Sequence, residues 1–159
     1  MKRRLLAGCI VAVTVLPAML SAQRQSSFDA LARNQLDQAG TAWKATGFAV
    51  RGEVRRAVLN AHEADTISVR LSMDSQYVLL GTCDRDCGDV DFLVHDSAGT
   101  LVGTDGTSDN HPWLSLAPKA NGPYTLRVIM VSCSVEPCYY ALQWLSRVAP
   151  PATKQARAP

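Results

Sequence analysis

The sequence has no excess of charge of either sign, and its basic residues are scarcely clustered. It contains 16 Lys and Arg residues against 14 Asp and Glu residues. If residues 2–4 (Lys-Arg-Arg) are removed with a leader, 13 basic residues remain against 14 acidic ones, a net charge of about −1. Arg51, Arg55 and Arg56 form the only other basic cluster, which we expect on a solvated strand face. Nucleic-acid binding needs clustered Lys and Arg, so no nucleic-acid partner is expected.

The signatures of hydrolases are also missing. The sequence has no G-x-S-x-G elbow, and His62-Glu63 lacks the second histidine of H-E-x-x-H because residue 66 is Thr. Residues 95–97 (His-Asp-Ser) are neighbours in sequence, and strand alternation would turn the carboxylate away from the imidazole. His111 lies in a loop with no evident partner. We therefore expect no catalytic residues and a protein that is not an enzyme.

Long apolar runs are confined to the N-terminus. Leu5–Leu20 is apolar and Ser21-Ala22 supplies small residues, so residues 1–22 are predicted to be a signal peptide cleaved before Gln23. The alternative, an uncleaved membrane anchor, would need a longer run. Cys9 stands in a sequence like a lipoprotein box, but the apolar run continues beyond it, and we interpret it as part of that run. We expect a secreted or periplasmic protein without stable membrane insertion after cleavage.

Cysteines are few, and only Cys83, Cys87, Cys133 and Cys138 follow the predicted cleavage site. An even number in an exported chain predicts two disulfides. A zinc site is the alternative, although zinc ligands more often have C-x2-C spacing. Four cysteines allow three pairings. We favour the local pairs Cys83–Cys87 and Cys133–Cys138, because the intervening Ser-Val-Glu-Pro of the second pair suits a hairpin tip.

The chain shows no repeats and no alternation of strands and helices of the kind found in nucleotide-binding α/β domains. Apolar residues at three- and four-residue steps, from Phe28 to Trp43, predict one α-helix within residues 23–46. From residue 47 the period changes to two, with turn signals such as Asp105-Gly106 between the alternating segments. This pattern predicts a mainly β fold, a jelly-roll-like antiparallel β-sandwich over residues 47–148. The Pro- and Ala-rich residues 149–159 are predicted to be a disordered tail.

Aspartates crowd the middle of the chain. The residues concerned are Asp84, Asp86, Asp89, Asp91 and Asp105, with Asp109 close by. Carboxylates this close repel one another unless a cation separates them, and Ca²⁺ prefers several oxygen ligands. The pattern matches neither an EF-hand nor an RTX repeat. The alternative, which we favour, is a hydrogen-bonded loop in which Asp89 or Asp91 caps backbone amides. We expect no cofactor, with calcium as the alternative.

Trp113 is the aromatic residue most suggestive of binding. If Leu114 and Leu116 face the core, Trp113 faces outward and could stack on a sugar or a partner side chain. The alternative is that Trp113 covers a sheet edge or meets the N-terminal helix. Trp43 and Trp144 are expected in the core.

Two motifs resemble a known family. Residues 89–99 (DVDFLVHDSAG) and 121–128 (NGPYTLRV) are similar to segments of the bacterial pre-peptidase C-terminal (PPC) domain. The cysteine-flanked residues 83–87 and 133–138 resemble a disulfide-bearing variant found in uncharacterised exported bacterial proteins. The resemblance covers about residues 50–147. It implies a non-catalytic β-sandwich associated with secretion, substrate adhesion or stabilisation of a neighbouring enzyme, in some members with bound calcium.

These observations together predict an exported, non-catalytic binding or accessory module. Its partner would be a protein or a polysaccharide such as a surface polymer. Since no protease domain precedes these residues in the sequence, an enzyme partner would belong to another chain. A calcium-stabilised structural or adhesion protein is the alternative function, and a small hydrolase is a third.

Overall fold

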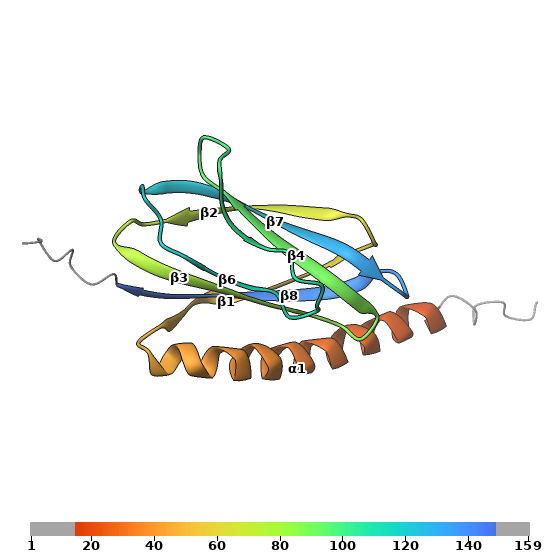
Figure 1. Ribbon diagram of the computed structural model, residues 1–159. Helices are drawn as coiled ribbons and strands as arrows, with labels where there is room; N and C mark the ends of the chain where they lie inside the picture. Colours follow the sequence, from red (N-terminus) through yellow and green to blue (C-terminus); the bar gives the residue numbers. More distant parts are fainter. Residues whose placement is uncertain (1–14, 149–159) are drawn as a thin grey trace, which may run out of the picture.

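The computed structural model describes residues 15–148, with side chains from residue 23 onward. Two four-stranded antiparallel sheets pack face to face, and one long helix lies along the outer face of one sheet (Figure 1). The helix is α1 (Val15–Ala45). The strands are β1 (Ala49–Leu59), β2 (Ala64–Leu71), β3 (Ser75–Cys83), β4 (Cys87–His95), β5 (Leu101–Asp105), β6 (Trp113–Leu116), β7 (Gly122–Cys133) and β8 (Cys138–Val148).

The strand orders are those of a jelly roll. One sheet runs β1-β8-β3-β6 and the other β2-β7-β4-β5, and every pair is antiparallel. The predicted mainly β sandwich with an N-terminal helix is therefore confirmed. Helix α1 reaches back to Val15, into the segment predicted as a signal peptide. Cleavage before Gln23 stays a prediction, while residues 1–14 and the predicted tail 149–159 lie outside the described residues.

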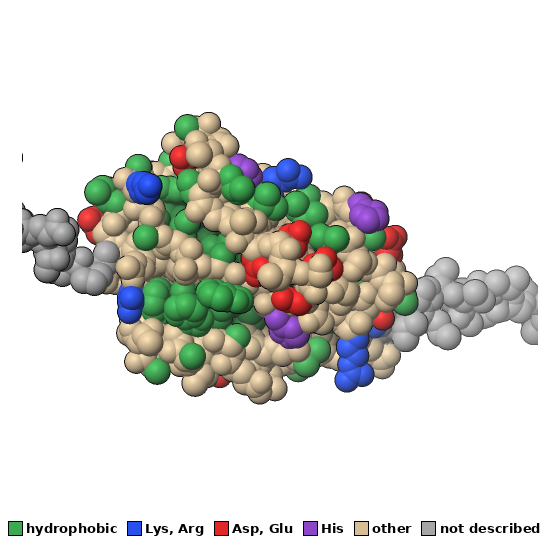
Figure 2. Space-filling model, viewed as in Figure 1, with side chains coloured by type: hydrophobic (Ala, Val, Ile, Leu, Met, Phe, Trp, Pro, Cys, Tyr) green, Lys and Arg blue, Asp and Glu red, His purple; other side chains and the backbone are tan. Residues whose placement is uncertain are grey.

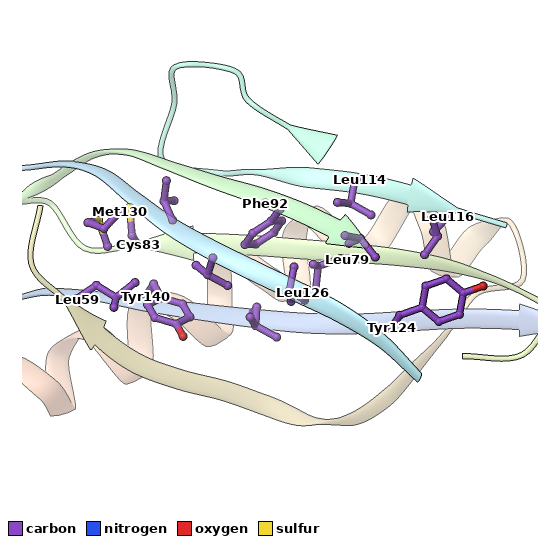
Figure 3. Packing of buried hydrophobic residues seen from close by; sticks show 14 of the residues in the cluster. Leu59, Leu79, Cys83, Phe92, Leu114, Leu116, Tyr124, Leu126, Met130 and Tyr140 are labelled. Atoms are coloured by element: carbon purple, nitrogen blue, oxygen red, sulfur yellow. The ribbon is translucent and has the colours of Figure 1, made fainter. Parts of the chain in front are cut away.

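The main core lies between the two sheets. Figure 3 shows side chains of both sheets pointing toward one another, among them Leu79 and Tyr140 from one sheet and Phe92 and Leu126 from the other. Burial alternates along β4 and β7, as expected of strands with one face in a core.

A second core lies between α1 and the outer face of the β1-β8-β3-β6 sheet. Phe28, Ala32 and Leu36 follow one another at four-residue steps and pack on Val78 and Leu80 of β3. Strand β3 is consequently buried on both faces from Tyr77 to Cys83. Burial on both faces explains why its sequence is a continuous apolar run rather than an alternation.

The two disulfides join the local pairs, Cys83–Cys87 and Cys133–Cys138, and this confirms the predicted pairing. Cys87 and Cys133 are direct partners in the β4–β7 register, so both bridges lie at the same end of the sandwich. Two disulfides fit an oxidising compartment. Within residues 15–148, no helix combines the length and hydropathy that crossing a membrane requires.

Candidate functional site

Trp113 begins the short edge strand β6. Along this strand Leu114 and Leu116 are buried in the main core, whereas Trp113 and Ser115 face outward. The Trp113 side chain is 52% exposed, and its ring lies 5.6 Å from the ring of Trp43 on α1. Both alternatives drawn from the sequence therefore hold in part, since Trp113 meets the helix and still presents half of its surface to solvent.

A groove of about 340 Å³ opens beside this tryptophan pair, between the end of α1 and β6. We call it the aromatic groove. Its lining residues are Trp43, Thr46, Phe48, Gln76, Tyr77, Ser115, Leu116, Ala117 and Arg147. Trp43 is half-buried rather than in the core, and its ring stands edge-on to that of Phe48 at 5.5 Å. Trp144, also expected in the core, is half-buried as well and packs edge-on against Tyr77.

The polar groups of the aromatic groove are held by neighbours. The Arg147 guanidinium lies 4.6 Å from the centre of the Phe48 ring. It donates hydrogen bonds to the Gln76 side-chain oxygen at 2.8 Å and to the Thr46 carbonyl at 2.9 Å. A cation over an aromatic face that also donates two hydrogen bonds is fixed in place. The groove therefore offers rigid aromatic walls and a largely satisfied polar rim.

Gly81 sets the position of the loop that leads into Trp113. A Cβ atom at residue 81 would lie 2.4 Å from Phe92 and 2.7 Å from Pro112. The Gly81 amide donates to the Pro112 carbonyl at 2.8 Å, which brings the β5–β6 loop onto β3. Sequence reasoning missed this residue, although a lone glycine inside a strand pattern signals a close approach of another segment.

Four carboxylates lie close together beside Trp113, where the start of β4 meets the β5–β6 loop. We call Asp89, Asp91, Asp105 and Asp109 the acidic cluster. In Figure 2 acidic side chains form a group on this face, next to a strip of hydrophobic side chains. The Val90 amide donates to the Asp109 carbonyl at 3.1 Å, so the loop is tied to the start of β4.

Asp105 is the structural centre of the acidic cluster. Its side chain is buried and accepts hydrogen bonds from the Trp113 amide, the Thr107 amide at 3.1 Å and the Thr107 hydroxyl at 2.7 Å. Asp109 accepts from the His111 amide at 2.7 Å and lies 3.0 Å from the same Thr107 hydroxyl, whose single hydrogen can go to only one of the two carboxylates. Asp105 and Asp109 thus accept backbone amides of the loop, a role that the sequence analysis gave to Asp89 or Asp91.

Asp89 and Asp91 are less well satisfied. Within the described residues the Oδ1 atom of each is buried without a hydrogen-bond partner, and no Lys or Arg forms an ion pair with the cluster. Burial raises the pKa of Asp89 above its ordinary value, and the neighbouring carboxylates Asp109 and Asp105 raise it further. Burial likewise raises the pKa of Asp91, with added repulsion from Asp89, Asp105 and Asp109.

Asp84 and Asp86 lie apart from this cluster, in the loop closed by Cys83–Cys87. The Arg24 guanidinium of α1 contacts the Asp86 carboxylate at 2.8 Å and that of Asp84 at 3.5 Å. Arg24 also lies over the ring of Tyr139, at 5.7 Å from its centre. The five aspartates that the sequence put forward as metal ligands are thus divided between two places.

No metal site is preformed in the part of the chain from residue 15 to 148, where no three His, Cys, Asp or Glu side chains are arranged to hold an ion. Calcium binding stays a prediction, and it would require the carboxylates of the acidic cluster to draw together.

The histidines lie on three different segments. His62 is in the β1–β2 turn, His95 ends β4, and His111 follows Asp109 in the β5–β6 loop. The Asp96 carboxylate accepts from the amides of Ala98 and Thr100, both at 2.9 Å, so it shapes its own turn. That engagement favours a structural role for Asp96 over a place in a triad. The absence of catalysis stays a prediction.

A comparison with known families finds no family model that matches the chain, and a comparison with curated proteins finds no match. The resemblance to the PPC domain therefore remains an expectation from the sequence.

Proposed function

We propose that this chain is an exported, non-catalytic binding module that contacts a protein partner or a surface polymer through the aromatic groove. The observation that carries the proposal is the Trp43–Trp113 pair, in which a half-exposed indole lies 5.6 Å from a second one at the rim of a groove. Exposed tryptophans are enriched among the residues that dominate binding energy. An accessory role of the kind implied by the PPC resemblance is consistent with this proposal.

The chemistry of the groove favours uncharged surfaces. The one cation in its lining, Arg147, already has three partners in Phe48, Gln76 and Thr46. The accessible aromatic surface is that of Trp113 and Trp43, because Phe48 and Tyr77 are buried. A sugar face or an apolar side chain can stack on such a surface while its polar groups meet the rim.

The test is co-sedimentation of the oxidised protein with insoluble cell-wall polymers and with an envelope fraction, comparing wild type with Trp113→Ala. We expect Trp113→Ala to weaken binding by about 30-fold, which corresponds to about 2 kcal/mol for a central tryptophan. Val135→Ala is the matched control, because Val135 is 53% exposed and lies between Cys133 and Cys138, outside the lining of the groove. Equal binding by both variants and wild type would contradict the proposal.

A calcium-stabilised structural or adhesion role is the second candidate. The observation favouring it is that the Oδ1 atoms of Asp89 and Asp91 are buried without partners among four carboxylates. Calcium at 100 times its Kd would add about 2.7 kcal/mol to the free energy of unfolding. This gain should raise Tm by roughly 10 °C over a chelator-treated sample. Asp91→Asn should abolish that shift and Asp74→Asn, at an exposed turn, should retain it. A wild-type Tm that is the same with calcium and with chelator would exclude this role.

A further inference from the structure

We propose that the partner of the aromatic groove is an extended segment of another protein, which adds as a strand to the free edge of β6 and places a Lys or Arg side chain beside the acidic cluster. This inference rests on the proposed function and deepens it, because it selects a polypeptide over a polysaccharide. The surface that the segment covers is the side of the sandwich between α1, β6 and β5.

A second groove opens on the other side of β6. We call it the apolar groove. It has a volume of about 520 Å³ and is lined by β5, β6 and residues 119–124. Leu101 and Val102 in its wall are 48% and 40% exposed. The apolar groove and the aromatic groove share Ser115, Leu116 and Ala117, so the two grooves meet along β6.

Strand β6 offers main-chain groups to an added strand. Its only neighbour in the sheet is β3. The Gly81 amide donates to the Pro112 carbonyl, so in the alternation of an antiparallel pair the N–H and C=O groups of Trp113 and Ser115 point away from β3. The Trp113 amide is already occupied, because it donates to Asp105. The Ser115 groups have no backbone partner within the described residues, and pairing is therefore possible there.

The two grooves match the period of a polypeptide strand. Successive side chains of a strand point to opposite faces. Along β6, Trp113 and Ser115 face outward, whereas Leu114 and Leu116 face inward. A strand added at this edge would send one side chain into the aromatic groove and the next into the apolar groove. In recognition by strand addition, main-chain hydrogen bonds supply affinity and pockets for alternate side chains supply specificity.

Charge selects the chemistry of the segment. The acidic cluster lies at the Trp113 end of β6, where Asp105 accepts from the Trp113 amide, and within the described residues it forms no ion pair. Ala117, where the grooves meet, lies about 13 Å from Trp113 along the strand. A segment with apolar side chains in the grooves thus meets the carboxylates about four residues further on. A Lys or Arg there would complement their charge, and Arg could also stack on Trp113.

The test selects peptides from a display library of random ten-residue sequences on the immobilised oxidised protein. The Kd of a selected synthetic peptide is then measured by fluorescence anisotropy. We expect selected peptides to carry adjacent apolar residues and, about four positions away, a Lys or Arg. Trp113→Ala should weaken binding of the selected peptide by about 30-fold. Recovery of no peptide, or only of peptides without a basic residue, would overturn the proposal.

The role of the acidic cluster is tested with Asp89→Asn/Asp91→Asn. We expect this variant to bind the selected peptide about fivefold more weakly, as for partly exposed ion pairs. Glu53→Gln/Asp74→Asn is the matched control, because it removes the same net charge at exposed positions that line neither groove. An equal Kd for the two double variants would contradict the proposed basic side chain.

The role of the apolar groove is tested with Val102→Ser. Loss of this apolar contact should weaken binding about fivefold. Val58→Ser is the control, because Val58 is 46% exposed on β1 and lies outside both grooves. Equal affinities of these two variants would show that the segment does not enter the apolar groove.

Strand addition also has a readout that a contact of side chains alone would not change. The Ser115 amide should exchange with solvent about tenfold more slowly when the selected peptide saturates the protein, because it gains a main-chain hydrogen bond. The Trp113 amide, already bonded to Asp105, should change little. Unchanged exchange at Ser115 would overturn strand addition. Polymer binding that depends on Trp113 without any selected peptide would overturn this inference and leave the proposed function standing.

Discussion

Two groups of aspartates that are close in sequence differ in whether a cation reaches them in the fold. Asp84 and Asp86 lie under Arg24, which reaches them from α1 at 3.5 and 2.8 Å. Asp89 and Asp91 lie only a few residues further on and form no ion pair within the described residues. A buried Oδ1 atom without a hydrogen-bond partner is common to Asp84, Asp89 and Asp91. These aspartates are close in sequence, but they do not form a single site in the fold.

The difference follows from the direction in which the strand leaves the disulfide loop. Asp84 and Asp86 belong to the turn between Cys83 and Cys87, which abuts the helix. Asp89 and Asp91 belong to β4, whose outer face turns toward the β5–β6 loop. The first group contacts a cation of α1, whereas the second forms no ion pair within the described residues.

The largest expected effect is a loss of stability in Gly81→Ala, which acts on the loop beside the second group of aspartates. Gly81→Ala would place a Cβ atom 2.4 Å from Phe92 and 2.7 Å from Pro112, so the loop that carries Asp109 must move. We expect the free energy of unfolding to fall by about 2 kcal/mol, as for overpacked cores. Gly106→Ala, where nothing lies within 4 Å, is the control in the same loop. Urea unfolding measures both, and equal stabilities would show that the close approach is unimportant.

An intermediate effect is expected from Arg24→Ala. The change removes the ion pairs to Asp84 and Asp86 and the contact with Tyr139, and it leaves the largely buried Asp84 carboxylate without a cation. Because the Arg24 side chain is 35% exposed, the loss should be only about 1 kcal/mol. Arg33→Ala, at an exposed position on the same helix that forms no ion pair within the described residues, should change stability little. A thermal melt that shows the same Tm for both variants would contradict this role of Arg24.

The smallest expected effect is a pH dependence of the free energy of unfolding, to which the acidic cluster should contribute. The pKa values of Asp89 and Asp91 are raised in the folded state from the ordinary value of 3.8. Their contribution to stability is therefore fully present below that value and is lost as pH rises through the raised pKa. Between neutral pH and about pH 4, the wild type should gain stability on acidification relative to Asp89→Asn/Asp91→Asn.

Asp65 opposes this trend at lower pH. The Tyr140 hydroxyl and Arg55 lower the pKa of Asp65, so its contribution is present above 3.8 and is lost as pH falls further. Urea unfolding at several pH values gives the wild-type-minus-variant difference. A difference that stays constant across the range would show that Asp89 and Asp91 do not titrate differently on folding.

Much of the fold could be predicted from local patterns. The alternation of buried and exposed positions in β4 and β7 and the four-residue steps of Phe28, Ala32 and Leu36 appear in the sequence and in the structure. The local disulfide pairs were favoured from the sequence, and the structure selects them from the three pairings that four cysteines allow. Such features depend on neighbours along the chain, and periodicity reports them directly.

The candidate site was only partly predictable. Outward-facing Trp113 followed from the alternation in β6, but the groove beside it needs Trp43, Phe48 and Arg147 from two other segments. No short sequence pattern marks Arg147 as the partner of Phe48, because the strands of the whole sandwich lie between them along the chain. Likewise, most of α1 and all of β1, β2 and β3 lie between Arg24 and its partner Asp86 along the chain.

The sequence by itself determined which positions along each strand and helix turn inward, that the four cysteines form two bridges, and that the chain builds a sandwich with one helix. Only the tertiary structure decided which aspartates receive Arg24 and which stay unpaired, and that Trp113 meets Trp43. The physical reason is range. Backbone geometry fixes the period of burial within a few residues, whereas the partner of a charge or an aromatic ring depends on how distant segments pack and align.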